Sequence, residues 1–256
     1  MINKPIIAAC VICSFVLPGM AEEYSQNIFT KKNASWNEDG NWSKGRMPIE
    51  EDKTVIMNFG CSAIVDQPFE GKIDVVVGNG NSAQPDGTLI IDADFNVVDI
   101  RVASLSASSG RVQQISGVVT LNSLLLVSTT AHEIEATYDL EGGTLETKYL
   151  NLAGALSIKG AGEVVTVSRK SEIGSQSTLR FLGSAAGFPT MSFGTYTIEP
   201  GASLEVEGDK AVKPGKYTLL LADEPLASRF NVNLTGFAAG KAKLLENESG
   251  LVLEVK

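Results

Sequence analysis

The 256-residue sequence contains few cysteine, histidine and aromatic side chains. It has three cysteines and one histidine, and Phe, Tyr and Trp together make up 7% of the chain. Cys10 and Cys13 lie in an N-terminal segment that we expect to be removed, which leaves Cys61 alone and excludes an internal disulfide in the mature chain. Stability must therefore come from packed secondary structure. Scarce aromatics combined with 25 glycines favour thin, turn-rich β structure.

Positive charge is also in short supply. The chain has 21 Lys and Arg against 30 Asp and Glu, a net charge of -9, and an isoelectric point near 4.8. An acidic surface repels phosphate backbones, so we expect no nucleic acid among the partners. The length suits one all-β domain, and no break in composition marks a second one.

The apolar run near the N-terminus, Ile6 to Leu17, is too short to cross a membrane as a helix. It follows Lys4, and a small residue, Ala21, stands where a signal peptidase would cut. A lipoprotein site ending at Cys10 is the weaker alternative, because the apolar run before it is short. The sequence thus predicts a signal peptide over residues 1–21. The mature protein would be extracellular or at the cell surface, or else periplasmic, with no integral membrane segment.

An internal repeat occupies the stretch from Gly87 to Gly154. Apolar residues recur there every 25 positions, and Gly117 and Gly142 share a turn position. A fixed period of this size is typical of a solenoid, in which each repeat is one coil stacked on the next. We therefore predict an all-β fold, a single-stranded right-handed parallel β-helix with coils of about 25 residues. The three apolar columns are Ile90, Ile115 and Leu140; Ile100, Leu125 and Leu150; and Val102, Val127 and Leu152.

Residues that alternate with these columns are expected to face outward. This outer surface mixes polar and apolar side chains, which suggests contact with another molecule. Its two columns are Asp99, Leu124 and Tyr149, and Arg101, Leu126 and Asn151.

Both tryptophans, Trp36 and Trp42, lie in one block of turn-forming residues from Ala34 to Ser43, after a polar leader without periodicity. The first coil of a solenoid has an open apolar end and an unpaired strand edge. We expect the block to cap that end. The alternative is a sugar-binding platform, since the faces of both indole rings could stack on pyranose rings.

Short strands begin at Thr54, and those after the turn at Lys213 to Lys216 are predicted to close the fold as an antiparallel set. The expected organisation is a signal peptide over residues 1–21, a leader and N-terminal cap over 22–53, a β-solenoid over 54–212 and a C-terminal β cap over 213–256.

Three parts of the chain carry a family resemblance: the opening from Trp36 to Asp52, the stretch Tyr138 to Leu145, and the closing segments Gly215 to Leu220 and Ser249 to Leu253. They are similar to exported bacterial β-solenoid proteins with autotransporter-associated β-strand repeats. Those proteins have coils rich in Gly-Gly-Thr and share the right-handed β-helix of pectate lyases. The resemblance implies fold and export rather than a particular activity.

No catalytic residue is assigned, although β-helix lyases and glycosidases work with clustered carboxylates. The best acidic group is Asp92, Asp94 and Asp99, with Arg101 beside it. These carboxylates could hold a cation such as calcium, the one cofactor considered. The alternative is a solvated turn that protects a strand edge.

Other candidate groups are weaker. Cys61 and His132 would form a catalytic pair only if the fold joined them, and a buried thiol and a surface imidazole are the simpler interpretation. Glu133 and Glu135 alternate on one face near His132. The Gly- and Asn-rich loop around Asp86 is interpreted as a connector, with a binding loop and a cation loop as alternatives.

The sequence therefore predicts a non-catalytic, exported β-solenoid, a structural or adhesion-type component of the surface or envelope. Its partner would be a glycan or a cell-surface protein, and its oligomeric state is left open. The alternative is a β-helix polysaccharide lyase or glycoside hydrolase. The carbohydrate-binding candidates are Trp36, Trp42 and Tyr149.

Overall fold

The computed structural model describes most of the chain after the expected signal peptide. The candidates Asp86, His132 and Glu133 lie outside the described residues, as does the segment 1–21, and the side chains of residues 54–57 and 163 are also not described. The described ranges are 26–52, 54–57, 60–78, 87–104, 109–128, 135–222, 230–247 and 250–256.

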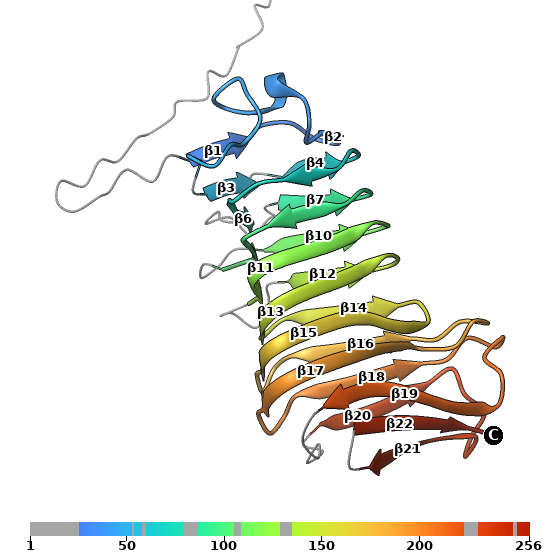
Figure 1. Cartoon of the computed structure of the whole chain (residues 1–256). Coiled ribbons are helices and arrows are strands. Elements are labelled where there is room, and N and C mark those ends of the chain that lie inside the picture. Colours follow the sequence, from blue (N-terminus) through green and yellow to red (C-terminus); the bar gives the residue numbers. More distant parts are fainter. Residues whose placement is uncertain are drawn as a thin grey trace, which may run out of the picture.

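The chain forms a β-solenoid of about 7 turns, each of roughly 25 residues, stacked as a rod (Figure 1). This confirms the predicted all-β fold of stacked parallel coils. Within the described residues, one nine-stranded sheet runs the length of the rod with all its neighbours parallel. In spatial order its strands are β2 (Ala34–Ser35), β4 (Cys61–Val65), β7 (Gly87–Ile91), β10 (Gly110–Gln114), β12 (Ala136–Leu140), β14 (Ala155–Lys159), β16 (Thr178–Leu182), β18 (Ser203–Glu207) and β20 (Asn231–Thr235).

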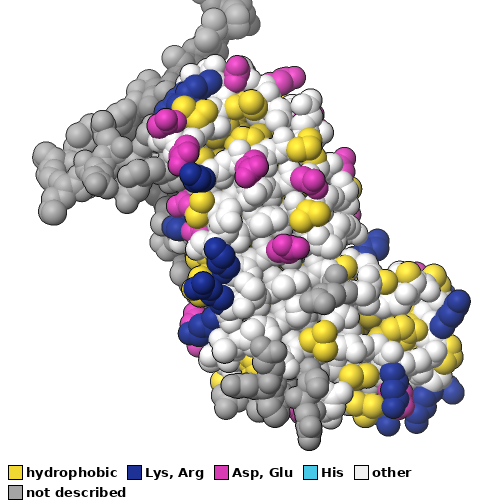
Figure 2. Space-filling view, viewed as in Figure 1, with side chains coloured by type: hydrophobic (Ala, Val, Ile, Leu, Met, Phe, Trp, Pro, Cys, Tyr) yellow, Lys and Arg dark blue, Asp and Glu magenta, His cyan; other side chains and the backbone are white. Residues whose placement is uncertain are grey.

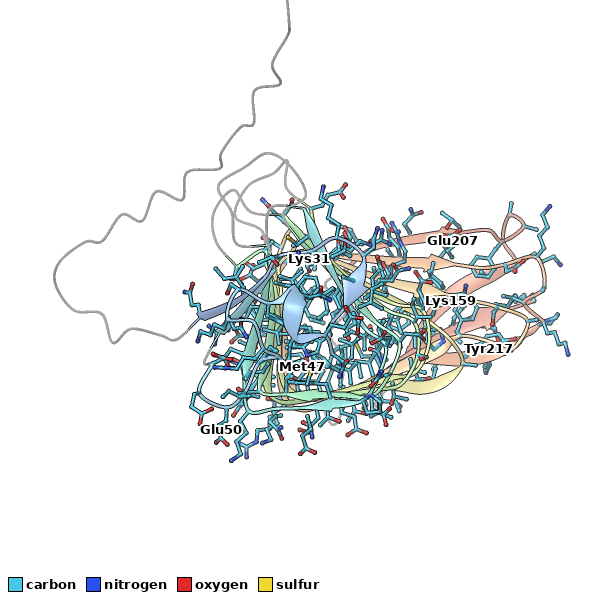
Figure 3. The ribbon with its side chains drawn as sticks, turned by 90° about the horizontal axis from the view of Figure 1, so that it is seen from above. Lys31, Met47, Glu50, Lys159, Glu207 and Tyr217 are labelled. Atoms are coloured by element: carbon cyan, nitrogen blue, oxygen red, sulfur yellow. The ribbon has the colours of Figure 1, made fainter. Side chains whose placement is uncertain are left out.

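A thirteen-stranded sheet, counted over the same described residues, forms the rest of each coil. It bends along a corner, because the separate strands β8 and β9 both pair with the single long strand β11. Each coil therefore has three faces, and side chains fill the space they enclose (Figure 3). The strands are β1 (Gln26–Phe29), β3 (Thr54–Met57), β5 (Phe69–Glu70), β6 (Asp74–Val77), β8 (Phe95–Val97), β9 (Asp99–Val102), β11 (Val118–Val127), β13 (Thr144–Leu152), β15 (Gly162–Ile173), β17 (Pro189–Ile198), β19 (Gly215–Ala222), β21 (Ala242–Asn247) and β22 (Gly250–Val255).

Two of the three predicted apolar columns are confirmed. Their members pair in register across β9, β11 and β13, and all are buried. Stacked aliphatic side chains of this kind supply the hydrophobic stabilisation of the coils, about 25 cal/mol for each Å² removed from water. The columns are Ile100, Leu125 and Leu150, and Val102, Val127 and Leu152.

The third predicted column is wrong in two of its three members. Gln114 pairs with Ile91 on one side and Leu140 on the other, so Ile90 and Ile115 lie outside the buried column. Ile115 is 43% exposed. The step along this column is 23 residues and then 26, because the turns differ in length.

The same difference in turn length shifts the position of the glycine that successive turns share. Gly143, rather than Gly142, stacks on Gly117, and both have positive φ, +78° and +76°. A Cβ atom on Gly143 would lie 2.0 Å from the carbonyl oxygen of Gly117. Only glycine fits this position, because the turns of successive coils touch there through their backbones.

Gln114 is a fully buried polar residue in an otherwise apolar column. Its Nε2 donates to the carbonyl oxygens of Gly117 and Thr144, at 3.1 and 2.9 Å. Its Oε1 accepts from the hydroxyl of Tyr138 at 2.8 Å. Burial raises the pKa of Tyr138, so the phenol remains a hydrogen-bond donor. The hydrogen-bonding groups of this amide are thus satisfied by its own coil and by the next one, as burial of a polar group requires.

The N-terminal end is closed by aromatic packing. The expected polar leader contributes β1, which pairs in parallel with β3, and β2 begins the block that holds both tryptophans. Trp36 and Trp42 pack edge to face with ring centroids 4.7 Å apart, and Phe29 contacts Trp42 at 4.9 Å. Met47 lies over the interior of the coils when the rod is seen from above (Figure 3).

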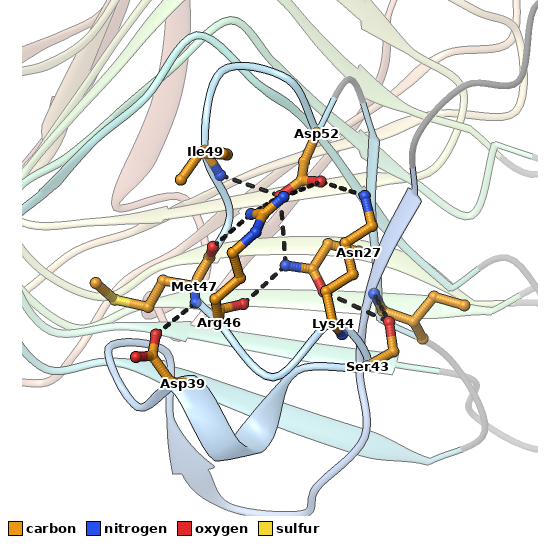
Figure 4. Close-up of polar contacts among 9 residues, drawn as sticks. Asn27, Asp39, Ser43, Lys44, Arg46, Met47, Ile49 and Asp52 are labelled. Carbon is orange, nitrogen blue, oxygen red and sulfur yellow. Dashed lines mark hydrogen bonds and ion pairs between the residues drawn. The ribbon is translucent and has the colours of Figure 1, made fainter.

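A buried carboxylate, Asp52, holds the loop of this cap in place (Figure 4). Lys44 and Arg46 donate to its two oxygens, each at 2.5 Å, and the backbone N–H of Ile49 donates at 3.1 Å. Burial on its own raises the pKa of Asp52, but the hydrogen bonds from Arg46 and Lys44 outweigh it and hold the pKa at about 2. Asp52 is therefore ionised in the folded protein at neutral pH.

We expect Asp52 to make the cap sensitive to acid. Its pKa is lower in the folded state than the ordinary value of 3.8, so its contribution, about 2 kcal/mol, is complete above pH 4. It is lost as the pH falls through about 2. Urea unfolding at pH 6 and pH 2.5 measures this, with Asp52→Asn as control. The stability difference between the two proteins should narrow on acidification, and a constant difference would contradict the assignment.

The C-terminal end closes only in part as predicted. β22 pairs antiparallel with both β19 and β21, as expected of a closing set. β20, in contrast, pairs in parallel with β18 and continues the solenoid. Among the described residues, no helix has the length and apolar character needed to span a bilayer.

Candidate functional site

The structure places Trp36 and Trp42 in the core, with 0% and 3% of their surfaces exposed. The indole N–H of Trp42 donates to the carbonyl oxygen of Trp36 at 2.8 Å. Rings enclosed by other side chains leave no face on which a pyranose ring could stack. Their burial therefore favours the capping interpretation over the sugar platform.

Asp92 and Asp94, between β7 and β8, each bind the neighbouring coil. Asp92 accepts from the hydroxyl of Ser116, and Asp94 accepts from the backbone N–H of Val118, both at 2.8 Å. Within the described part of the chain, no three Asp, Glu, His or Cys side chains are grouped so that they could hold a metal. The structure thus uses these two carboxylates to join successive turns and does not bring them together with Asp99.

Asp99 lies on the outward side of β9 but is only 5% exposed, contrary to the expectation of an open surface position. One oxygen accepts from the backbone N–H of Leu124 at 2.9 Å, and the other accepts from Arg101 at 2.8 Å. A second carboxylate, Asp74, lies 3.6 Å from the same guanidinium and pairs in register with Asp99.

Sequence reasoning missed Asp74. It stands 25 residues before Asp99, so the repeat period extended one coil towards the N-terminus would have found it. Burial, and then the charge of Asp99, raise the pKa of Asp74, while Arg101 opposes the shift. Two stacked carboxylates thus share one cation, and Asp74 holds its proton more tightly than an ordinary aspartate.

Tyr149 is the one predicted carbohydrate-binding residue that the structure places at the surface, with 37% exposed. It lies on the outer face of β13, between Leu124 of the preceding coil and Lys170 of the next. Arg169 donates to its hydroxyl at 3.1 Å, and the guanidinium carbon is 5.9 Å from the ring centroid. The ring is therefore held in one orientation at an exposed position.

Arg169 reaches Tyr149 because the corner of the coil contains extra residues. The register slips between Thr147 and Tyr149 on β13 and between Val167 and Lys170 on β15. Such bulges turn a side chain out of the regular alternation. Here they place Lys148 and Arg169 at the corner, a position that alternation along the strand did not predict.

We call Lys148, Tyr149, Arg169 and Lys170 the Tyr149 corner. Lys170 pairs with Glu172 at 2.5 Å, and the amide of Asn151 donates to Glu172 at 3.4 Å. Figure 2 shows Lys and Arg side chains gathered at mid-height along the edge of the rod where β13 and β15 lie. An exposed aromatic ring is thus bordered by cations at the bulged corner of two successive coils.

Cys61 is a half-buried free thiol whose pKa is raised by burial, which disfavours the reactive thiolate. His132 lies outside the described residues, so the structure does not test the pairing of the two. Comparisons with family models, with curated proteins and with solved structures returned no match to this chain.

Proposed function

We propose that this protein is an exported, non-catalytic β-solenoid of the cell surface or envelope that binds a glycan or a cell-surface protein through the Tyr149 corner. The observation that carries the proposal is the exposed ring of Tyr149, whose hydroxyl accepts a hydrogen bond from Arg169 at the bulged corner of the coils. Tyrosine supplies a large, rigid, amphipathic contact surface at low cost in conformational entropy.

The stacked coils support this role mechanically. Each coil continues the backbone hydrogen bonds of the one before, so the binding face needs no rearrangement to be presented. The Trp-rich opening and the Gly-Gly-Thr coil also support assignment to the autotransporter-associated repeat type. Residues 1–21 would direct export, with Glu22 as the mature N-terminus.

One preparation tests the binding and export parts of this proposal. The full chain is expressed in a bacterial host, and the exported protein is recovered. Its intact mass should correspond to a chain beginning at Glu22, and retention of Met1 would overturn the export assignment. On an array of neutral and anionic glycans and surface proteins, the same material should bind, and Tyr149→Ala should weaken binding about tenfold. Unchanged binding by Tyr149→Ala would remove the corner from the proposal.

A polysaccharide lyase or glycoside hydrolase is the second candidate, and Asp74 with its raised pKa is the observation that favours it. A general acid needs such a carboxyl, and Asp99 and Arg101 lie beside it. A reducing-sugar assay on pooled polysaccharides separates the candidates. If the wild-type protein releases reducing sugar ends and Asp74→Asn does not, the binding role would be replaced by a catalytic one.

A further inference from the structure

We infer that the ligand of the Tyr149 corner is an anionic polysaccharide, whose charge comes from uronic acid carboxylates or sulfate groups. This inference rests on the proposed function, because it names the ligand class of the same site.

The first support is the charge of the corner. The chain as a whole carries a net charge of -9, yet Lys148, Arg169 and Lys170 bring three cations to this surface. Two carboxylates lie nearby: Glu172 pairs with Lys170, and Glu146 is exposed two residues before Lys148 on β13. Within the described part of the chain, Lys148 and Arg169 have no carboxylate partner within ion-pairing distance. An exposed excess of cations on an acidic protein favours a ligand of the opposite sign.

The second support is the arrangement of these cations. Lys148 and Arg169 occupy the corner bulges of successive strands, β13 and β15, and Lys170 follows on the strand that carries Arg169. Neighbouring strands lie about 4.8 Å apart, so these two strands present positive charge at two positions separated by about that distance. A linear polymer with an anion on each unit can meet the cations of both strands at once.

The third support is the ring between the cations. Tyr149 presents an exposed aromatic surface with a polar tip, and its hydroxyl is already bound to Arg169. Asn151 lies in the adjoining outer column, where its amide donates to Glu172, and Thr195 lies in the same column as Tyr149, where its hydroxyl donates to the carbonyl oxygen of Arg169. The remaining donor and acceptor positions of these two groups face the same surface as the ring. Ring stacking and hydroxyl recognition distinguish a sugar chain from a simple polyanion. A nucleic acid is disfavoured by the acidity of the rest of the molecule.

The experiment measures binding of the full chain to immobilised polygalacturonate, heparin and neutral dextran at 50 and 200 mM NaCl. We expect binding to one or both anionic polymers and none to dextran, with affinity falling several-fold at the higher salt concentration. The triple variant Lys148→Gln, Arg169→Gln, Lys170→Gln should lose about tenfold or more in affinity. Comparing the affinities for polygalacturonate and heparin shows whether the site prefers carboxylate or sulfate groups.

The matched control combines Lys241→Gln, Lys243→Gln and Lys256→Gln. It also removes three cations, one of them paired with a carboxylate, but from the C-terminal end, and it should leave affinity unchanged. Equal losses in both variants would show non-specific attraction and overturn the inference. Dextran binding that depends on Tyr149 would also overturn it, while leaving the proposed binding function in place. Unchanged binding of every array ligand by Tyr149→Ala would instead remove the Tyr149 corner from the proposed function.

Discussion

Replacing Trp36 by alanine is expected to lower the free energy of unfolding by about 3–5 kcal/mol. Trp36 is fully buried and contacts the rings of Trp42, Phe69 and Phe95 at centroid distances of 4.7, 5.3 and 5.1 Å. Alanine would leave a cavity at the junction of the cap and the first coils. Urea unfolding followed by circular dichroism measures the loss.

Tyr149→Ala is the control for this experiment, because it removes an aromatic ring from the surface and should cost about 1 kcal/mol or less. Trp36→Phe should give an intermediate loss, since it keeps part of the buried ring. If Trp36→Ala were as stable as Tyr149→Ala, the aromatic cluster would not be what holds the N-terminal end closed.

Gly143→Ala is expected to destabilise the fold by about 3–5 kcal/mol, from two causes. The first is its backbone, since φ is +78° and a Cβ atom there costs about 1–2 kcal/mol. The second is contact, since the new atom would lie 2.0 Å from the carbonyl oxygen of Gly117 and force two turns apart. The midpoint of urea unfolding reports the effect.

Gly162 offers a matched control for Gly143. It has the same φ of +78°, but a Cβ atom added there meets no heavy atom within 4 Å. Gly162→Ala should therefore show the backbone cost alone, about 1–2 kcal/mol. Equal losses at both positions would mean that the turns of neighbouring coils separate without resistance.

The sequence was sufficient to predict the fold where coil length is constant. Ile100, Leu125 and Leu150 are each 25 residues apart, so a fixed period located their column directly. The period failed at Ile90 and Ile115, because the turns before them differ in length. A turn can absorb one or two residues at little cost, and the pattern of apolar residues alone does not show where it does so.

The candidate site was predictable only in part. Alternation identified Tyr149 as outward, but not Arg169, which reaches it through a bulge. Composition could not decide between cap and sugar platform for Trp36 and Trp42, because large aromatics suit both. Asp92 and Asp94 were identified as a group by their closeness in sequence, whereas the fold directs each to a different partner on the next coil.

The buried amide of Gln114 has a consequence for how the rod assembles. Coils of similar length and apolar lining can stack in more than one order, and a chain shifted by one repeat would still bury its leucines and valines. In such a shifted stack the amide would face an aliphatic side chain, and an unpaired buried amide costs about 1–3 kcal/mol. The hydroxyl of Tyr138 would lose its acceptor at the same time. One buried polar residue thus favours the correct register of this coil over a stack shifted by one repeat. A single buried asparagine fixes the alignment of a coiled coil in the same way.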